Sequence, residues 1–315
     1  MEQAMSEKQK TQTWLLDQVA KSEFFHQKVH LWGLLAVADE LERVRGDELE
    51  WNMDALGITP AAWNRVIHQG IKPIRVFAHP TILTKIPGAV GYYRMLAMVS
   101  QKSMNGVGLS VVKYESRLTL PSEDIAQKIA AHLNAIISRL IEADSTLDER
   151  EFDLWRGMSA GAQAQGAWLN AKGEEVQKTV SGLIQRRLLD SGLVSQPPVD
   201  WKHVTLSDGR KIVFGEDPDI AVYRSGRVRA AVEIKGGIDP AGVLERLGAA
   251  LKSLSRVREE HPTAVTVLMM HKSALTATAT QDLEINRAVV TNWLTIEDIL
   301  TDQKAREELF DLLEI

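Results

Sequence analysis

Apolar residues at helical intervals dominate the first half of the chain. They recur every three or four positions across residues 14–41, which predicts a helix there. Thr59 followed by Pro60 is typical of a helix start, with a capping hydroxyl and a proline at the first helical position. Ser122 precedes a longer stretch of the same periodicity, which predicts an amphipathic helix with one face in a core. We therefore expect residues 1–160 to form a mainly helical region.

The second half changes to short apolar segments separated by turn residues. A helix is predicted over about 171–190, because Gly192 ends its apolar pattern. A further helix over about 239–260 precedes residues 264–270, a wholly apolar run that suits a strand covered on both faces. This order of elements predicts an α/β fold for residues 161–315, in which a mixed sheet is flanked by helices. The other expected strands are Val204–Leu206, Lys211–Phe214, Ile220–Tyr223, Val228–Ile234 and Ala288–Leu294.

Composition describes an ordinary globular protein whose length suits two domains. The chain has 315 residues, of which 44% are hydrophobic and 25% are charged. It contains no cysteine, which excludes disulfides, thiolate nucleophiles and cysteine-based metal sites. The first residues are polar, unlike a signal peptide, and no apolar run reaches the roughly 20 residues that span a bilayer. We expect a cytoplasmic protein without a membrane segment.

Charge is distributed unevenly along the chain. The formal net charge is −5, yet residues 56–119 carry eight basic side chains and one acidic side chain. A basic stretch of this kind can bind a phosphate backbone even in an acidic protein, and it is equally compatible with an ordinary solvated surface. Under the first interpretation, Lys72, Arg75 and Arg94 are the members that we expect to contact DNA.

Two side chains near the end of one predicted strand, and one that precedes the neighbouring strand, carry the candidate chemistry. Glu233 and Lys235 alternate with Val232 and Ile234 along this strand, so the two charged residues share one face. Charged side chains at the exit of an apolar strand are costly unless they are solvated or used. Asp219, which precedes the neighbouring strand, turns an isolated pair of charges into a candidate active site.

The pairing of these two strands decides whether Asp219 and Glu233 meet. A two-residue turn at Ser225-Gly226 would place Asp219 opposite Val232, with its carboxylate on the other face of the sheet. A three-residue loop, or a bulge near Asp219, would place Asp219 opposite Glu233. We therefore predict the longer loop or a bulge.

Two carboxylates beside an ammonium group form a site for a hard divalent cation. Mg²⁺ prefers oxygen ligands and takes one or two carboxylates, while water and substrate phosphate complete its shell. We expect Asp219, Glu233 and the main-chain carbonyl of Ile234 to be the ligands. Lys235 would hold or help to deprotonate the attacking water and offset the charge of the transition state. This chemistry predicts hydrolysis of a phosphodiester bond.

The same residues resemble the motif of a nuclease superfamily. Pro218-Asp219, followed by Glu233-Ile234-Lys235 on the next strand, is similar to the PD-(D/E)XK motif, and its spacing of 14 residues is typical of that motif. The resemblance covers roughly residues 165–270 and implies a PD-(D/E)XK core. It also implies a Mg²⁺-dependent nuclease that acts on double-stranded DNA, with residues 161–315 as the nuclease domain and residues 1–160 for DNA binding or dimerisation.

Further stretches resemble type II restriction endonucleases, and the chain as a whole resembles the XcyI-type family, whose members cut CCCGGG. This resemblance implies a homodimer that reads a palindrome with one active site per strand. It also implies a cognate DNA methyltransferase as genetic partner. The stretches that carry it are Phe24–Gln27, Gly91–Met95, Gly166–Gly173 and Gly236–Arg246.

Related nucleases often carry a glutamate on the first core helix that points at the metal. Gln177 occupies the position that we align with it, and Glu174 and Glu175 are the alternatives on the same helix. A role for this helix in binding a second metal is therefore left open.

Several charged residues are candidates for DNA contacts. In restriction enzymes that read CCGG-type sites, an acidic residue followed by arginine contacts bases near the position of Glu245-Arg246. Arginine can donate to guanine and glutamate can accept from cytosine. The alternative is an ordinary exposed ion pair on a helix. Arg186 and Arg187 flank the proposed site and suit phosphate contacts.

Two other functions remain open. A structure-specific or repair nuclease of the same superfamily would use the same site on branched or damaged DNA. A DNA-binding regulator, built on the basic N-terminal half, would carry the second half without catalysis. The intact set Asp219, Glu233 and Lys235 favours an enzyme over the regulator.

Overall fold

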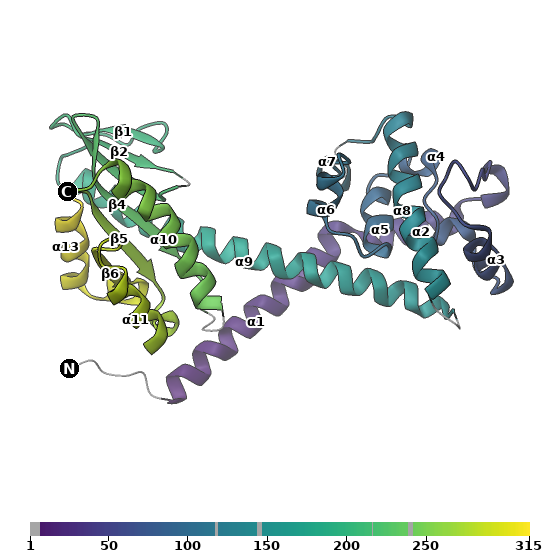
Figure 1. Cartoon of the computed structure of the whole chain (residues 1–315), viewed down its shortest axis with the longest axis horizontal. Coiled ribbons are helices and arrows are strands. Elements are labelled where there is room, and N and C mark those ends of the chain that lie inside the picture. Colours follow the sequence, from purple (N-terminus) through teal and green to yellow (C-terminus); the bar gives the residue numbers. More distant parts are fainter. Residues whose placement is uncertain (1–6, 117–118, 144–146, 216, 239–241) are drawn as a thin grey trace. The chain divides into compact units, whose positions relative to one another are not determined.

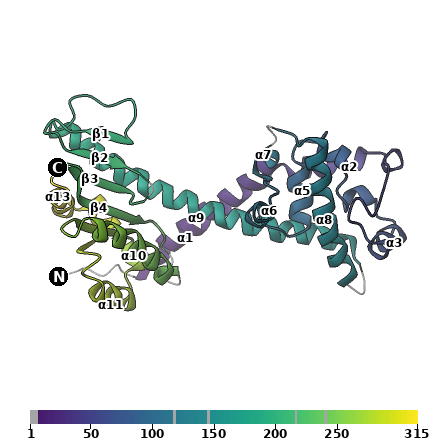
Figure 2. The same ribbon diagram turned by 45° about the horizontal axis from the view of Figure 1, so that its top comes forward.

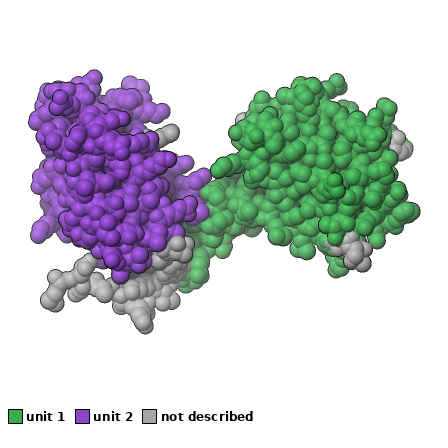
Figure 3. Space-filling view, viewed as in Figure 1, with its two compact units in different colours: residues 1–168 green, residues 169–315 purple. Residues whose placement is uncertain are grey.

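The computed structural model divides the chain into two compact units, residues 1–168 and 169–315 (Figure 3). The division falls inside one helix, α9 (Glu149–Asp190), so the helix predicted over 171–190 is the last part of a longer one. Among the described residues, no helix has the length and apolar character that crossing a membrane requires. The structure describes residues 7–116, 119–143, 147–215, 217–238 and 242–315.

The N-terminal unit is arranged around α8 (Glu123–Ala143), which packs against α3, α4 and α5 (Figure 1). Ile129, Leu133 and Ile137 on one face of α8 are fully buried, which confirms the amphipathic helix predicted after Ser122. The described part of this unit contains helices and no strand, in agreement with its predicted helical character. Its other elements are α1 (Glu7–Trp32), α2 (Leu34–Arg43), η1 (Gly46–Glu48), α3 (Pro60–His68), η2 (Pro73–Arg75), α4 (Pro80–Leu83), α5 (Ala89–Leu96), α6 (Gln101–Gly106) and α7 (Val112–Glu115).

Gly33 and Thr59 mark helix boundaries in this unit. Gly33 has a φ of +58°, a left-handed conformation that glycine adopts without steric cost, and it separates α1 from α2. The helical structure predicted over residues 14–41 is confirmed, and Gly33 divides it into two helices. Thr59 accepts a hydrogen bond from the Ala62 amide at 3.3 Å, which confirms the predicted cap of α3.

A six-stranded mixed sheet forms the centre of the C-terminal unit. Its strands lie in sequence order, antiparallel from β1 to β4 and parallel from β4 to β6. This topology confirms the predicted α/β class with a mixed sheet flanked by helices. The predicted start of α10 at Asp239 lies outside the described residues. The elements are β1 (His203–Thr205), β2 (Lys211–Phe214), β3 (Ile220–Arg224), β4 (Arg227–Lys235), α10 (Val243–Glu260), β5 (Val265–Met270), η4 (Lys272–Ala274), α11 (Ala277–Ile285), β6 (Asn292–Thr295), α12 (Ile296–Thr301) and α13 (Gln303–Leu312).

Helices cover both faces of this sheet. The last part of α9 packs through Val180 against the face that carries Val232. α10 and α11 cover the other face (Figure 2). Leu247 of α10 and Ala231 of β4 belong to the buried apolar cluster between them. Because side chains alternate along a strand, Glu233 points to the α10 face. β5 contributes buried side chains to the apolar clusters on both faces of the sheet. This confirms the prediction that residues 264–270 form a strand covered on both faces.

A bulge in the β3–β4 hairpin sets the register of the two strands. The turn is the two-residue turn at Ser225-Gly226, so the longer loop is not formed. The register shifts between Val222 and Tyr223, and beyond the shift Ile220 lies opposite Val232. The predicted bulge is thus present, although it lies closer to the turn than to Asp219.

Candidate active site

Asp219 directly precedes β3, and Glu233 lies near the end of β4. Ile220, the first residue of β3, is paired with Val232 of β4. One position beyond this antiparallel pair, Asp219 therefore lies opposite Glu233. Asp219 is 9% exposed, and its Oδ2 accepts a hydrogen bond of 2.6 Å from the Ile234 amide. The strand pairing and this hydrogen bond bring both acidic residues to the same end of the sheet.

Gln177 of α9 holds the other carboxylate oxygen of Asp219. Its Nε2 donates to Asp219 Oδ1 at 3.0 Å and to the carbonyl of Gly215 at 3.2 Å. Glu174 and Glu175 are exposed on the same helix. The residue that α9 presents to Asp219 is therefore a hydrogen-bond donor rather than a third carboxylate.

Glu233 is 4% exposed, and each of its carboxylate oxygens has a partner. Lys235 Nζ donates to Oε1 at 2.6 Å. Ser253, on α10, has its Oγ 2.8 Å from Oε2. The buried carboxylate is thus held from its own strand and from the helix that covers it, and the ammonium group lies beside it.

Burial raises the pKa of Asp219 to about 6, from its usual 3.8. The hydrogen bond from the Ile234 amide lowers the pKa, whereas the negative charge of Glu233 raises it further. A carboxyl group whose pKa is raised in this way binds its proton more tightly than an exposed carboxyl group does, and a bound cation would compete with that proton. This is the electrostatic pattern expected where two carboxylates share a cation site.

Three residues extend the site beyond those predicted from the sequence. Ser253 Oγ also contacts Asp217 Oδ1, and Arg256, one turn farther along α10, forms an ion pair with Asp217 Oδ2. The hydrogen bond from Ser253, together with Arg256, outweighs the effect of burial and lowers the pKa of Asp217. Asp217 is two residues before Asp219 in the sequence, so the motif could have indicated it. The sequence gives no such indication of Ser253, because no periodic pattern connects a serine on a helix with a glutamate on the preceding strand.

The oxygen donors of this site fit a hard divalent cation. Asp219 and Glu233 supply two carboxylates, and the amide of Ile234, the residue after Glu233, donates to the first of them. Among the described residues, no group of three or more histidine, cysteine, aspartate or glutamate side chains is close enough to hold a metal. Two carboxylates with water and phosphate as the remaining ligands match Mg²⁺ better than a metal enclosed by side chains.

The structure corrects the prediction that Arg94 contacts DNA. Arg94 is 1% exposed and forms an ion pair with Glu115 through two of its nitrogens. It also donates to the Val99 carbonyl and to the side chain of Gln163. A buried charge must be paired and hydrogen-bonded, and here these partners take up the guanidinium. Arg94 is a structural residue of the N-terminal core.

Lys72 and Arg75 are more accessible, but both have acidic partners. Lys72 Nζ lies 3.1 Å from a Glu42 carboxylate oxygen, and Arg75 Nε lies 2.8 Å from the other. Arg75 also pairs with Glu149. Part of the basic excess of residues 56–119 is thus neutralised within the unit, and the DNA contacts of Lys72 and Arg75 stay predictions.

The two arginines predicted on α9 differ in environment. Arg186 is exposed. Arg187 lies 3.3 Å from a Glu307 carboxylate oxygen, and its guanidinium lies over the ring of Phe310, 4.9 Å from the ring centre. Arg186 therefore has the more accessible charge for a phosphate.

Glu245 and Arg246 occupy the first turn of α10, and Glu245 is exposed. Arg246 is half-buried and folds back onto the loop that follows Lys235. A Cβ atom on Gly237 would lie 2.8 Å from the guanidinium of Arg246, and one on Gly242 would lie 2.9 Å from it. The glycines make room for this arginine beside the end of β4.

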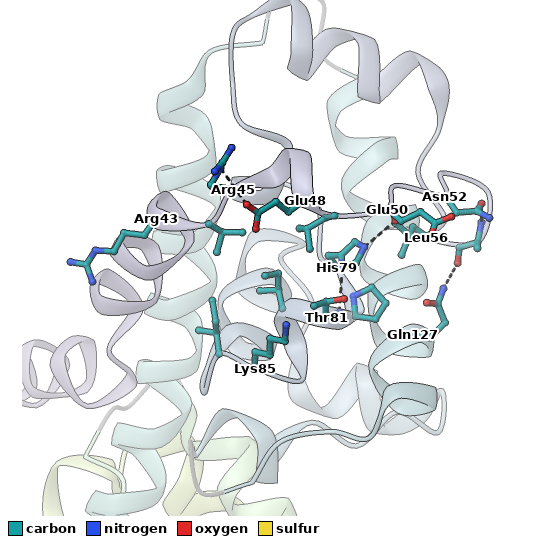
Figure 4. A pocket seen from close by; sticks show the side chains of 16 residues that line it. Arg43, Arg45, Glu48, Glu50, Asn52, Leu56, His79, Thr81, Lys85 and Gln127 are labelled. Atoms are coloured by element: carbon teal, nitrogen blue, oxygen red, sulfur yellow. Dashed lines mark hydrogen bonds and ion pairs between the residues drawn. The ribbon is translucent and has the colours of Figure 1, made fainter.

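A cavity of about 930 Å³ in the N-terminal unit contains none of the predicted catalytic residues (Figure 4). Arg45 and Lys85 are among the residues that line it. Its histidine, His79, accepts a hydrogen bond at Nδ1 from the Thr81 amide, so Nε2 carries the proton that is donated to the Glu50 carbonyl. Burial lowers the pKa of His79. His79 is thus a neutral cap of α4, and this cavity is not the candidate active site.

Comparison with known protein families shows to which family this chain belongs. The model of the XcyI restriction endonuclease family matches residues 42–315, a range that includes Asp219, Glu233 and Lys235. The chain belongs to the XcyI restriction endonuclease family. The predicted resemblance to this family is confirmed, although the stretch Phe24–Gln27 lies outside the matched range.

Two curated proteins are similar to this member of the XcyI restriction endonuclease family. The type II restriction enzyme XcyI of Xanthomonas campestris pv. cyanopsidis is 24% identical over 229 residues, which cover 64% of this chain and 65% of the relative. The type II restriction enzyme Cfr9I of Citrobacter freundii is 24% identical over 205 residues, which cover 60% of this chain and 62% of the relative. The chain therefore spans just under two thirds of the length of these relatives.

Proposed function

We propose that the protein is a type II restriction endonuclease of the PD-(D/E)XK superfamily. It would hydrolyse phosphodiester bonds of double-stranded DNA with Mg²⁺ as cofactor. The observation that carries the proposal is the Asp219 carboxylate, bound to the amide of Ile234 between Glu233 and Lys235. Membership of the XcyI restriction endonuclease family supports the same class of reaction.

Each residue of the site has its own part in the proposed reaction. Asp219, Glu233 and the Ile234 carbonyl would hold Mg²⁺, which when bound polarises the scissile phosphate and favours ionisation of water. Lys235 holds the attacking water and stabilises the charge that develops on the phosphate oxygens. Its contact of 2.6 Å with Glu233 keeps the ammonium group in place before DNA arrives, so little reorganisation is needed.

Sequence specificity in this proposal comes from α10 of two copies of the chain. A homodimer would present two sites to a palindrome, one for each strand, and the proposed palindrome is CCCGGG. Glu245 and Arg246 are the proposed base-reading residues, because glutamate can accept from cytosine and arginine can donate to guanine. A restriction enzyme requires protection of the host's own sites, so a cognate DNA methyltransferase in the cytoplasm is the proposed genetic partner.

Phosphate contacts would supply the affinity that is independent of sequence. Arg186, and with it Arg187, is proposed to contact the DNA backbone beside the site. Residues 1–160 are proposed to contribute DNA binding or dimerisation, with Lys72 and Arg75 as contacts, which would require both to exchange their acidic partners for phosphate.

The proposal is tested by incubating the protein with phage DNA and Mg²⁺ and mapping the ends of the products. Discrete fragments that share the terminal sequence of a CCCGGG site are expected. Lys235→Ala is expected to bind the same DNA and to reduce cleavage by about 100-fold or more, because it removes charge stabilisation from the transition state.

Other cleavage patterns would contradict the proposal in different ways. Cleavage restricted to branched or damaged DNA would indicate a structure-specific or repair nuclease with the same site. Tight binding without cleavage, equal in the wild type and in Lys235→Ala, would indicate a DNA-binding regulator.

A further inference from the structure

Ser253 is a buried polar residue on the inner face of α10, and its position is unusual for a helix serine. It is 5% exposed, between the buried apolar residues Ala250 and Leu254. Its Oγ lies 2.8 Å from Glu233 Oε2 and also contacts Asp217 Oδ1. A serine inside a helix usually faces solvent or bonds to its own helix, whereas this one bonds to two carboxylates from other segments.

The two carboxylates compete for one hydroxyl proton. A serine hydroxyl donates a single hydrogen bond, so it can satisfy either Asp217 or Glu233 at any moment. Asp217 has a second partner, because Arg256 pairs with its other oxygen. Glu233 is almost completely buried, and its other carboxylate oxygen accepts a hydrogen bond from Lys235. Ser253 therefore bridges the two carboxylates, and Arg256 gives Asp217 a partner that does not depend on the Ser253 proton.

We infer that Ser253 is a positioning residue for Glu233, and that Asp217 and Arg256 fix Ser253 in turn. The inference rests on the proposed function, in which Glu233 is a metal ligand. With Oε2 held from α10 and Oε1 facing Lys235, the carboxylate plane of Glu233 is fixed before the cation binds. Partners that orient a metal ligand typically change metal affinity or activity by 10- to 100-fold when they are removed.

The chain offers a matched pair of serines for the test. Ser253→Ala removes the hydroxyl that touches Glu233, and Ser253→Thr retains it. Ser255→Ala removes a hydroxyl two residues farther along α10, on a side of the helix that does not face Glu233. For each variant, the Mg²⁺ concentration that gives half-maximal cleavage is measured, together with binding of Mn²⁺ alone by electron paramagnetic resonance and the temperature of unfolding.

Ser253→Ala is expected to raise the half-maximal Mg²⁺ concentration and the Kd for Mn²⁺ by about 10-fold or more. Ser255→Ala is expected to leave both unchanged, and Ser253→Thr to restore most of the wild-type value. Wild-type Mg²⁺ dependence and Mn²⁺ binding in a folded Ser253→Ala protein would overturn the inference.

Arg256→Gln provides a second route if Ser253→Ala does not fold, because the Arg256 side chain is largely exposed. It frees Asp217 to compete for the Ser253 proton and is expected to weaken Mn²⁺ binding by about threefold to 10-fold. Unchanged Mn²⁺ binding in this variant would overturn the inference. Weaker Mn²⁺ binding in Ser253→Ala, beside a wild-type protein that cleaves no DNA, would support the positioning role and contradict the proposed function alone.

Discussion

The backbone amide of Ile234 donates a hydrogen bond of 2.6 Å to the carboxylate of Asp219. Strand pairing between β3 and β4 ends at Ile220 opposite Val232, so beyond this pair a side chain takes the place of a main-chain acceptor. Asp219 is thereby fixed to the short segment that also carries Glu233 and Lys235. The hydrogen bonds thus connect both acidic residues and the lysine to the end of β4.

The free energy of unfolding should depend on pH because burial raises the pKa of Asp219. Its pKa is raised from the usual 3.8 to about 6, so between these values the folded protein binds more protons than the unfolded chain. Stability from this group is therefore highest below about pH 4 and falls as the pH rises to about 6, by about 3 kcal/mol at most.

Asp219→Asn cannot ionise and is expected to lack this part of the slope. The measurement is the free energy of unfolding in urea at several pH values between 4 and 7, with EDTA present. Parallel profiles for Asp219→Asn and the wild type would contradict the raised pKa.

Gln177 should affect catalysis through Asp219. Gln177→Ala removes the hydrogen bond of 3.0 Å to Oδ1 and frees the carboxylate to rotate, so cleavage is expected to fall by about 10-fold or more. Gln185→Ala, on the same helix, is the control and is expected to cleave at the wild-type rate. Equal kcat values for Gln177→Ala and Gln185→Ala would show that Asp219 needs no support from α9.

Arg94 should govern stability and not DNA affinity. Arg94→Met leaves Glu115 as a buried charge without its main partner, which is expected to cost about 3–5 kcal/mol of unfolding free energy. Arg94→Met combined with Glu115→Leu removes both charges and is expected to recover much of this loss. Thermal denaturation measures both effects, and a loss of DNA affinity in the well-folded double variant would restore Arg94 as a DNA contact.

Gly237 should affect recognition of the DNA sequence, because it leaves space for the side chain of Arg246. A Cβ atom at Gly237 would lie 2.8 Å from the end of a flexible side chain, so Gly237→Ala is expected to displace Arg246 while the fold is kept. If Arg246 reads guanine, cleavage at the cognate site should fall by about 10-fold or more, since a good arginine–guanine contact contributes roughly 1–3 kcal/mol.

Gly248→Ala is the control for that variant, because the added carbon would have no neighbour within 4 Å outside the adjoining backbone of its own helix. This change is expected to leave cleavage intact and to stabilise α10 slightly. Wild-type cleavage in Gly237→Ala would argue against base reading by Arg246 in its observed position.

The parts of the fold that follow from local periodicity were predictable from the sequence. Alternation along β4 placed Glu233 and Lys235 on one face, and the apolar run of β5 indicated a strand covered on both faces. Both features depend only on neighbouring residues. The mixed sheet followed from the order of these elements.

The features that the sequence did not reveal depend on contacts between distant segments. Arg94 looks like any surface arginine until Glu115 and Gln163 are seen around it. Ser253 carries no sequence signal, because its partner Glu233 lies on another element. Gly33 interrupts an otherwise continuous apolar pattern through its φ of +58°, which periodicity does not encode.

The bulge in the β3–β4 hairpin has a consequence for the spacing of the motif itself. Arg229 is its extra residue, because the two neighbours of Arg229 pair with consecutive residues of β3. Deleting Arg229 would remove the irregularity, leave Asp219 and Glu233 in line, and shorten the interval between them from 14 residues to 13. The interval records the length of a hairpin and not a requirement of catalysis. Relatives with a shorter hairpin can therefore carry an equivalent site, and a sequence search that fixes the interval would pass over them.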